Sequence, residues 1–307
     1  MNNKRILITG ASGMIGYHFA NRLAVGNKVF ATSRFSKKDR RRRLEERGCV
    51  CIYFDAVNSD LSALPSEVDI CFNFAALFNG EPEELFQVNC HFVGRLLEHI
   101  DPNCRVIHTS SVAVYEVVPS GTPIREDMPA FGRGRYGVSK SCSEHIAMHV
   151  AEHRNMSLSI FRLWYPYAED PSDETNYIME LIRNVQAGKE FVFGPRPYPQ
   201  QPLHLDDLLH FAEKAVSESR HGTPLIVNVS GPETRDGRDI IKLIADQIGI
   251  KPNIIEGTDP EVRPTYNGTL DHTLLHTRLG QGKIGCEEGI RRAVSNFLSF
   301  KMKKNDE

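Results

Sequence analysis

Short apolar runs recur along the first half of the chain and alternate with segments whose apolar residues follow a helical spacing. The runs are residues 4–10, 28–34, 49–55, 68–76, 104–111 and 158–166. Between two of them, residues 82–100 carry Phe86, Cys90, Val93 and Leu97 along one stripe, as on one face of a helix. Strands that are apolar throughout and alternate with helices are typical of a parallel sheet covered on both faces. The pattern therefore predicts an α/β fold with a Rossmann-like, doubly wound parallel sheet.

The alternation of strands and helices becomes less regular after Pro166, and prolines cluster between Phe193 and Pro202. We therefore expect a first domain over residues 1–165 and a smaller C-terminal lobe over residues 166–307. Some elements of the second part are expected to return to the first domain.

Composition and charge narrow the class of protein. The chain has 307 residues, a formal net charge of −2 at pH 7, 40% hydrophobic residues and 25% charged residues. These values are ordinary for a soluble globular protein and give no electrostatic reason to expect nucleic acid or an anionic membrane as a partner. No apolar run approaches the roughly 20 residues of a membrane span, and residues 1–10 contain no hydrophobic signal region. The seven cysteines include no CxxC pair, which indicates buried thiols and a cytoplasmic location.

The first apolar run leads directly into ITGASGMIG, which has glycines at positions 10, 13 and 16. Glycine lets the backbone approach a phosphate closely, and free N–H groups at the start of a helix favour negative charge. Between a strand and a helix this pattern indicates a dinucleotide-binding domain, although GxxGxxG differs from the more common GxGxxG. A tight turn without a ligand is the alternative. The residues predicted to hold the pyrophosphate are Gly10, Ser12, Gly13, Met14, Ile15 and Gly16.

The end of the second run favours one dinucleotide over the other. NAD-binding proteins usually carry an acid there for the ribose 2′-hydroxyl, whereas arginine suits a 2′-phosphate. The residue here is Arg34, preceded by Ser33, with Lys37 and Lys38 nearby. The sequence therefore favours NADP(H), with NAD(H) possible. The adjacent run of four arginines at positions 40–43 is interpreted as a solvated helix face.

Asp55 ends the third apolar run and is followed by Ala56. Both are predicted to lie at the adenine of the cofactor. A plain cap at the end of the strand is the alternative for Asp55.

A tyrosine and a lysine follow one another at helical spacing in RYGVSK. Tyr136 and Lys140 are four residues apart, so they share one face if the segment is helical. A phenol with a pKa near ~10 is a poor base at neutral pH, but a neighbouring ammonium lowers that pKa. The pair is a candidate acid/base, provided that the fold brings a substrate and a cofactor to it.

These segments together resemble the extended short-chain dehydrogenase/reductase superfamily, the branch of epimerases, dehydratases and reductases. The similarity covers nearly the whole chain, in the family's order, through TGASGMIG, DICFNFAA, VNCHFVGRLLE, HTSSVAVYE, RYGVSK, FRLWYPYA, PLHLDDL, IVNVSGPE and EEGIRRAVSNF. The resemblance implies that Tyr136 is the acid/base, that Lys140 binds the nicotinamide ribose and lowers the pKa of Tyr136, and that Ser111 hydrogen-bonds the substrate oxygen.

The resemblance also implies further contacts. It predicts that Asn89 supports the strand that bears the serine. The residues assigned by it to the cofactor are Phe74, Ala75, Ala76, Asn89, Thr109, Tyr136, Lys140 and Tyr165, and those assigned to the substrate are Ser111, Val112, Asn176 and Arg263. Asn176 and Arg263 have an equally good interpretation as surface polar residues.

The sequence departs from the family pattern at two places. Val112 and Ala113 stand where a 4,6-dehydratase of this family carries Asp-Glu, so a dehydratase is not expected. Tyr165 stands where nucleotide-sugar members commonly carry asparagine, which changes the shape and polarity of the predicted pocket.

The predicted function is therefore an NADPH-linked carbonyl reduction or alcohol oxidation on a nucleotide sugar or a metabolite of similar size, with residues 166–307 as the substrate-binding lobe. A nucleotide-sugar epimerase that retains its nicotinamide cofactor is the alternative. Three histidines at positions 145, 149 and 153 share one helix face but lack the glutamate of HExxH, so no metal is expected. The resemblance implies a homodimer.

Overall fold

The computed structural model describes residues 1–115, 122–132, 134–173, 175–195, 197–257 and 269–305. A parallel seven-stranded sheet lies at its centre, in the order β11-β6-β5-β4-β1-β2-β3. Its strands are β1 (Arg5–Thr9), β2 (Lys28–Ser33), β3 (Val50–Tyr53), β4 (Ile70–Asn73), β5 (Arg105–Ser111), β6 (Ser157–Leu163) and β11 (Leu225–Val229). The six predicted strands and the doubly wound class are confirmed, and β11 comes from the second half of the chain.

The direction in which the strands are added reverses at β1, which has β2 on one side and β4 on the other. In an open parallel sheet, a ligand binds at such a switch point, in the crevice beyond the carboxyl ends of the strands. The turn after β1 and the ends of β4 and β5 lie at this edge. The topology therefore puts the glycine turn and Ser111 at the same edge of one sheet.

Helices cover both faces of the sheet because successive side chains of each strand point to opposite sides. Ile6 and Ile8 of β1 belong to one hydrophobic cluster and Leu7 to the other. The first cluster is covered by α1 (Met14–Leu23), α2 (Lys38–Glu46), α7 (Leu205–Glu218) and α9 (Thr273–Leu279). The second is covered by α4 (Phe92–His99) and α5 (Gly134–His153).

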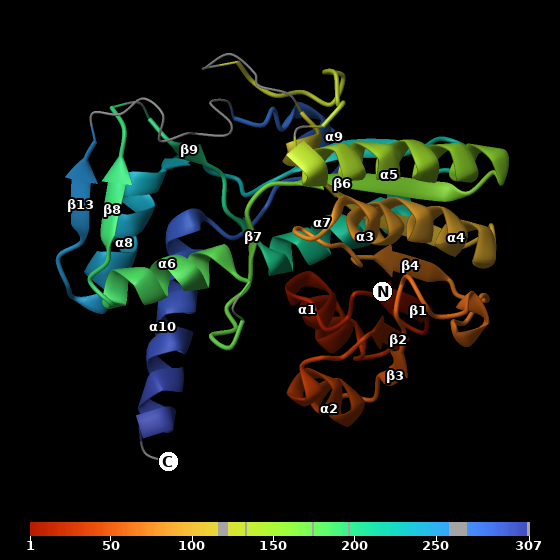
Figure 1. Cartoon of the computed structure of the whole chain (residues 1–307), viewed down its shortest axis with the longest axis horizontal. Coiled ribbons are helices and arrows are strands. Elements are labelled where there is room, and N and C mark those ends of the chain that lie inside the picture. Colours follow the sequence, from red (N-terminus) through yellow and green to blue (C-terminus); the bar gives the residue numbers. More distant parts are fainter. Residues whose placement is uncertain (116–121, 133, 174, 196, 258–268, 306–307) are drawn as a thin grey trace.

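A second group of elements has its own core and lies on one side of the sheet, at the left of Figure 1. It consists of α6 (Tyr177–Gln186), α8 (Gly237–Ile248), α10 (Cys286–Asn305) and the parallel pair β8 (Glu190–Phe193) and β13 (Asn253–Glu256). The apolar faces of the three helices meet at residues such as Ile182, Ile240 and Ile290, which are all fully buried or nearly so.

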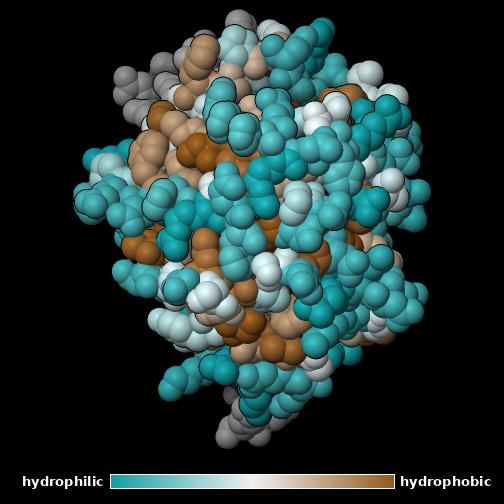
Figure 2. Space-filling view, turned by 90° about the vertical axis from the view of Figure 1, so that its right-hand side faces the viewer, coloured by the Kyte–Doolittle hydropathy of each residue, from teal (hydrophilic) through white to brown (hydrophobic). Residues whose placement is uncertain are grey.

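The remaining elements are short. They are α3 (Pro82–Phe86), a π-helical segment (Gln87–His91), two 3₁₀ turns (Leu61–Ala63 and Val112–Val114), and the two-residue strands β7 (Pro166–Tyr167), β9 (Pro199–Gln200), β10 (Leu203–His204) and β12 (Arg235–Asp236). Among the described residues, no helix has the length and apolar character needed to cross a membrane. The face in Figure 2 is mainly polar, with apolar residues gathered in separate small areas.

Candidate functional site

The glycine turn after β1 is built for close backbone contact. Gly10 has φ +66°, and a Cβ added to it would come within 2.8 Å of the Ala75 backbone nitrogen. A Cβ on Gly16 would lie 2.4 Å from the Gly10 carbonyl oxygen. Gly10 therefore lets β1 and β4 approach each other, and Gly16 lets α1 begin directly beneath the turn.

The start of α1 suits an anion. Gly13 is its N-cap and provides no side-chain hydrogen bond to the first backbone N–H groups, and the first turn contains no acidic residue. These N–H groups and the positive end of the helix dipole favour a phosphate. A cavity of about 440 Å³ adjoins the turn, and Gly10, Ser12 and Gly13 line it. Met14 and Ile15, also predicted to bind the pyrophosphate, are half-buried and pack against the core beneath α1.

The same cavity extends along the ends of β2, β3 and β4. Predicted cofactor residues that line it are Ser33, Arg34, Asp55, Ala56, Phe74, Ala75 and Ala76. Arg34 is exposed, and the hydroxyl of Ser33 is hydrogen-bonded to that of Ser12. Asp55 accepts hydrogen bonds from the backbone N–H groups of Val57 (2.8 Å) and Asn58 (3.2 Å), so its carboxylate also closes the turn after β3. The glycine turn at one end of the cavity and the exposed Arg34 suit a negatively charged ligand.

Polar side chains join the ends of β1, β4 and β5. Thr9 accepts from the Ala75 backbone N–H at 3.1 Å and donates to the Asn73 side chain at 2.6 Å. Thr109 donates to the Asn73 carbonyl oxygen at 3.2 Å and is buried, so its hydroxyl braces β5 against β4. Asn73 also contacts His108 of β5, whose other ring nitrogen is hydrogen-bonded to Ser143 of α5. Sequence reasoning missed Thr9, Asn73, His108 and Ser143, since isolated polar residues in apolar strands carry no motif.

The predicted catalytic residues approach one another through a close contact of backbones. Ser111 ends β5, and its hydroxyl accepts from the Ala113 N–H at 3.2 Å, which fixes the turn that follows. A Cβ on Gly137 of α5 would lie only 2.2 Å from the Ala113 carbonyl oxygen. The helix turn that carries Tyr136 therefore packs directly on the turn after Ser111. Tyr136 is half-buried, and Lys140 follows one turn later on the same helix.

Lys140 is fully buried. Burial lowers its pKa to about 8, against an opposing effect of Glu144 one turn further along α5. Glu144 is itself held by Arg162, which donates to it from Nε at 3.0 Å and from Nη2 at 2.7 Å and to Tyr115 at 2.8 Å. Arg162 thus lies in a buried charge network with Glu144 and Tyr115.

Asn89 lies in the π-helical segment and has a different role from the predicted one. Its side chain accepts from the Leu77 N–H at 2.8 Å and donates to the Leu77 carbonyl oxygen at 2.9 Å and to Ser139 at 2.9 Å. Ser139 in turn donates to the Tyr136 carbonyl oxygen at 2.8 Å. Asn89 therefore braces the loop after β4 and the turn that bears Tyr136, not the strand of Ser111, because the π-helical segment faces that loop and α5.

Phe78 follows this braced loop and was not predicted from sequence. Its ring stacks on Tyr136 with centroids 4.8 Å apart, although 68% of Phe78 is exposed. The stacking therefore places an exposed aromatic ring directly against the candidate acid/base.

Tyr165, predicted to contact the cofactor, and the predicted substrate residues lie in different surroundings. Tyr165 has φ +46°, an unfavourable backbone conformation for tyrosine, and stacks on Tyr177 with centroids 5.0 Å apart. Val112 is buried in the small cluster that borders Tyr165. Asn176 is fully buried, caps α6 and donates to the Ala168 carbonyl oxygen at 2.5 Å, so a substrate contact there stays a prediction. Arg263 lies outside the described residues.

Comparisons with known proteins found relatives over most of the chain. A family model described as the NAD dependent epimerase/dehydratase family matches residues 6–230. A dTDP-6-deoxy-L-talose 4-dehydrogenase (NAD(P)(+)) of Kitasatospora kifunensis is 24% identical over 90% of each chain. A UDP-glucose 4-epimerase of Mycolicibacterium smegmatis is 26% identical over 95% of this chain and 98% of the other.

Solved structures share the fold. The structure of a UDP-glucuronic acid 4-epimerase from Bacillus cereus, in complex with UDP-glucuronic acid and NAD, superimposes with a TM-score of 0.82 at 20% identity, over 96% of this chain and 99% of the other. The family match covers most of the sheet, the glycine turn and the Tyr136 helix. The chain belongs to the NAD dependent epimerase/dehydratase family.

Proposed function

We propose that this protein is an NAD(P)-dependent oxidoreductase that interconverts a carbonyl and an alcohol on a nucleotide sugar or a metabolite of similar size. The observation that carries the proposal is the packing of Gly137 on Ala113, which holds the Tyr136 turn against the turn after Ser111. The turn after β5 lies at the same carboxyl edge of the parallel sheet as the glycine turn, which borders the cavity of about 440 Å³. Proton transfer and cofactor binding can then occur side by side.

Each residue of the trio has a distinct role. Tyr136 gives a proton to the substrate oxygen during reduction and takes it back during oxidation. Lys140 as a cation favours the phenolate form of Tyr136, and its burial strengthens that effect because little water screens the charge. Ser111 donates a hydrogen bond to the same substrate oxygen and orients it.

The cofactor would be held by the turn at Gly10 and Gly13, with Arg34 at the ribose of the adenosine half. When bound, the nicotinamide supplies the hydride chemistry. An exposed arginine on the cavity wall supports NADP(H), because it pairs with a 2′-phosphate. The dehydrogenase relative carries NAD(P)(+) in its name, whereas the epimerase structure was determined with NAD, so both dinucleotides belong in the test.

An epimerase that oxidises and re-reduces one substrate is the second candidate, supported by the epimerase relatives. A 4,6-dehydratase is disfavoured because Val112, which follows Ser111, is buried and apolar. The valine side chain has no acidic group that could protonate a leaving hydroxyl.

The experiment incubates the full chain with UDP- and dTDP-hexoses and with their 4-keto derivatives, in the presence of NADPH, NADH, NADP⁺ or NAD⁺. The absorbance of the reduced nicotinamide is followed during the reaction, and the products are analysed by NMR. Stoichiometric loss or gain of reduced cofactor supports the dehydrogenase. A product with an inverted C4 centre, formed without net change in the amount of reduced cofactor, supports the epimerase. Failure to bind any dinucleotide would overturn both candidates.

A further inference from the structure

Arg40 differs from the other three arginines of its run, because it is buried. Only 5% of it is exposed, whereas the side chains of Arg41, Arg42 and Arg43 are 45%, 68% and 51% exposed. The interpretation of residues 40–43 as a solvated face is therefore wrong for Arg40. A buried guanidinium needs partners for its charge and its donors.

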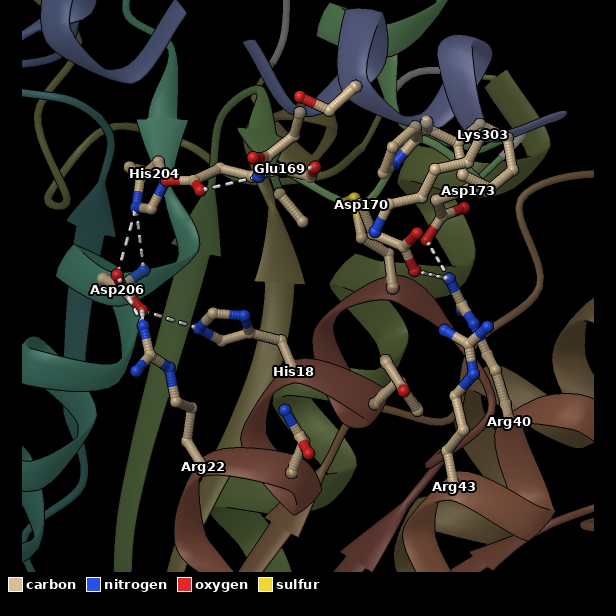
Figure 3. Close-up of a pocket in the computed structure, with 18 residues that line it drawn as sticks. His18, Arg22, Arg40, Arg43, Glu169, Asp170, Asp173, His204, Asp206 and Lys303 are labelled. Atoms are coloured by element: carbon tan, nitrogen blue, oxygen red, sulfur yellow. Dashed lines mark hydrogen bonds and ion pairs between the residues drawn. The ribbon is translucent and has the colours of Figure 1, made fainter. Parts of the chain in front are cut away.

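The partners of Arg40 belong to both parts of the molecule. Its Nη1 donates to the Ser12 carbonyl oxygen at 2.8 Å, inside the glycine turn. Its Nη2 donates to Asp173 at 2.7 Å and to Asp170 at 3.3 Å, in the segment after β7. Figure 3 shows the guanidinium of Arg40 pointing toward the two carboxylates beside a cavity of about 500 Å³. The ring of Tyr17, in α1, lies 4.8 Å from the guanidinium carbon.

Asp173 extends this connection into the second lobe. It is fully buried, and its other oxygen accepts from the Thr175 N–H at 3.0 Å and from the Thr175 hydroxyl at 2.7 Å. The next residue, Asn176, caps α6, whose first residue Tyr177 stacks on Tyr165 at the predicted substrate side. Burial raises the pKa of Asp173, but the hydrogen bond and charge of Arg40, together with the hydrogen bonds from Thr175, outweigh it and hold that pKa below its ordinary value.

We propose that Arg40 is a positioning residue that couples the shape of the cofactor turn to the start of α6, so that dinucleotide binding orders the substrate side. The link is a single guanidinium bonded to a carbonyl of the turn and to a carboxylate of the segment before α6. Asp173 is not among the residues that line the cavity at the glycine turn, and its connection to that turn runs through the hydrogen bonds of Arg40. The inference rests on the proposed cofactor site.

The test is a double-mutant cycle on the full chain, with Arg40→Met, Asp173→Asn and both together. Dissociation constants for NADPH and NADH are measured by nucleotide fluorescence. We expect Asp173→Asn to weaken binding about tenfold, the cost of loosening one charge-assisted hydrogen bond to the turn. The double variant should bind no more weakly than Arg40→Met alone, because both changes break the same link.

The matched control pair is Arg42→Met and Asp39→Asn on the same helix, an exposed ion pair with 2.8 Å between its atoms. We expect these changes, alone or together, to leave dinucleotide binding unchanged. Arg40→Lys keeps the positive charge but not the forked donors of the guanidinium. The dinucleotide affinity of this variant should therefore lie between that of the wild type and that of Arg40→Met.

A second readout separates coupling from a general loss of stability. Amide hydrogen exchange of residues 175–186 is measured with and without NADPH. The cofactor should slow exchange at the start of α6 in the wild type and not in the double variant. That variant should fold even if a single change does not, because it leaves no buried charge unpaired.

Two results would overturn the coupling alone: a folded Asp173→Asn protein with wild-type affinity for dinucleotide, or cofactor-induced protection of α6 that persists in the double variant. A wild-type chain that binds neither NADPH nor NADH would overturn the proposed function as well. The two failures are thus distinguishable.

Discussion

Replacing Gly137 by alanine tests whether the packing of α5 on the turn after Ser111 sets the catalytic geometry. The new Cβ would lie 2.2 Å from the Ala113 carbonyl oxygen. Neither atom can rotate away, because the Ala113 oxygen is a backbone atom and the new Cβ is bonded directly to the backbone Cα of residue 137. The helix or the turn must therefore retreat by about 0.8 Å for the contact to reach even 3.0 Å.

This displacement acts directly on the separation of Tyr136 from Ser111. A misplacement of about 1 Å costs on the order of 100-fold in rate, so we expect kcat to fall by roughly that factor. Overpacking should also lower the free energy of unfolding by about 1–3 kcal/mol. The dissociation constant of the dinucleotide should rise much less than kcat falls, because the proposed phosphate site is the glycine turn after β1 and only the proposed contacts of Tyr136 and Lys140 move with α5.

The assay is steady-state turnover of the sugar nucleotide that the wild type converts, with urea unfolding and dinucleotide binding measured on the same preparations. Gly94→Ala is the matched control, because its Cβ would meet Cγ2 of Ile146 at 3.0 Å, and that side chain can move. We expect the control to retain wild-type kcat. A folded Gly137→Ala protein with wild-type kcat would refute the geometric argument.

Three further changes test single roles. Tyr136→Phe should abolish turnover and leave dinucleotide binding almost intact; unchanged turnover would remove Tyr136 from the mechanism. Arg34→Asp should weaken NADPH binding at least tenfold and spare NADH, because a carboxylate repels a 2′-phosphate; equal affinity of the wild type for both dinucleotides would contradict the role of Arg34. Lys140→Met should abolish turnover yet stabilise the fold at pH 7 by up to about 3 kcal/mol, because it removes a buried charge. The pKa of Lys140 is lowered from 10.5 to about 8 in the folded protein, so between these pH values the unfolded wild type binds one more proton than the folded form. The stability of the wild type therefore rises with pH over this range. In urea unfolding, the advantage of Lys140→Met should disappear by pH 10.5. A stability difference between the two proteins that is constant from pH 7 to pH 10.5 would contradict this.

Most of the sheet could be predicted from the sequence, because it depends on short-range patterns. Apolar runs of strand length predicted β1 to β6, and the glycines predicted the tight turn between β1 and α1, whereas anion binding at that turn stays a prediction. The seventh strand, β11, was not predicted as part of this sheet. It is five residues long and comes after the proline-rich segment, and its neighbour β6 is more than sixty residues away in sequence. Only the tertiary fold pairs them.

Which of four consecutive arginines is buried could not be decided from charge alone. One signal was nevertheless present, since Leu44 is the single apolar residue of α2 and Arg40 lies one turn before it. Residues four apart share a helix face, so the burial of Leu44 carries Arg40 inward. What the sequence could not supply is the partner: Asp173 lies 133 residues away, in a segment without a motif.

The buried polar residues behind the site explain how Lys140 can be its cation. Thr9 donates to the Asn73 oxygen, so the Asn73 amino group faces Nδ1 of His108, which must accept. The proton then lies on Nε2, which donates to Ser143, and the imidazole is neutral. Burial and the charge of Lys140 both lower the pKa of His108 well below 6.5. A histidine cation here would repel Lys140 and oppose its protonation. The hydrogen bonds that hold His108 neutral therefore leave Lys140 as the positive charge that can favour the phenolate of Tyr136.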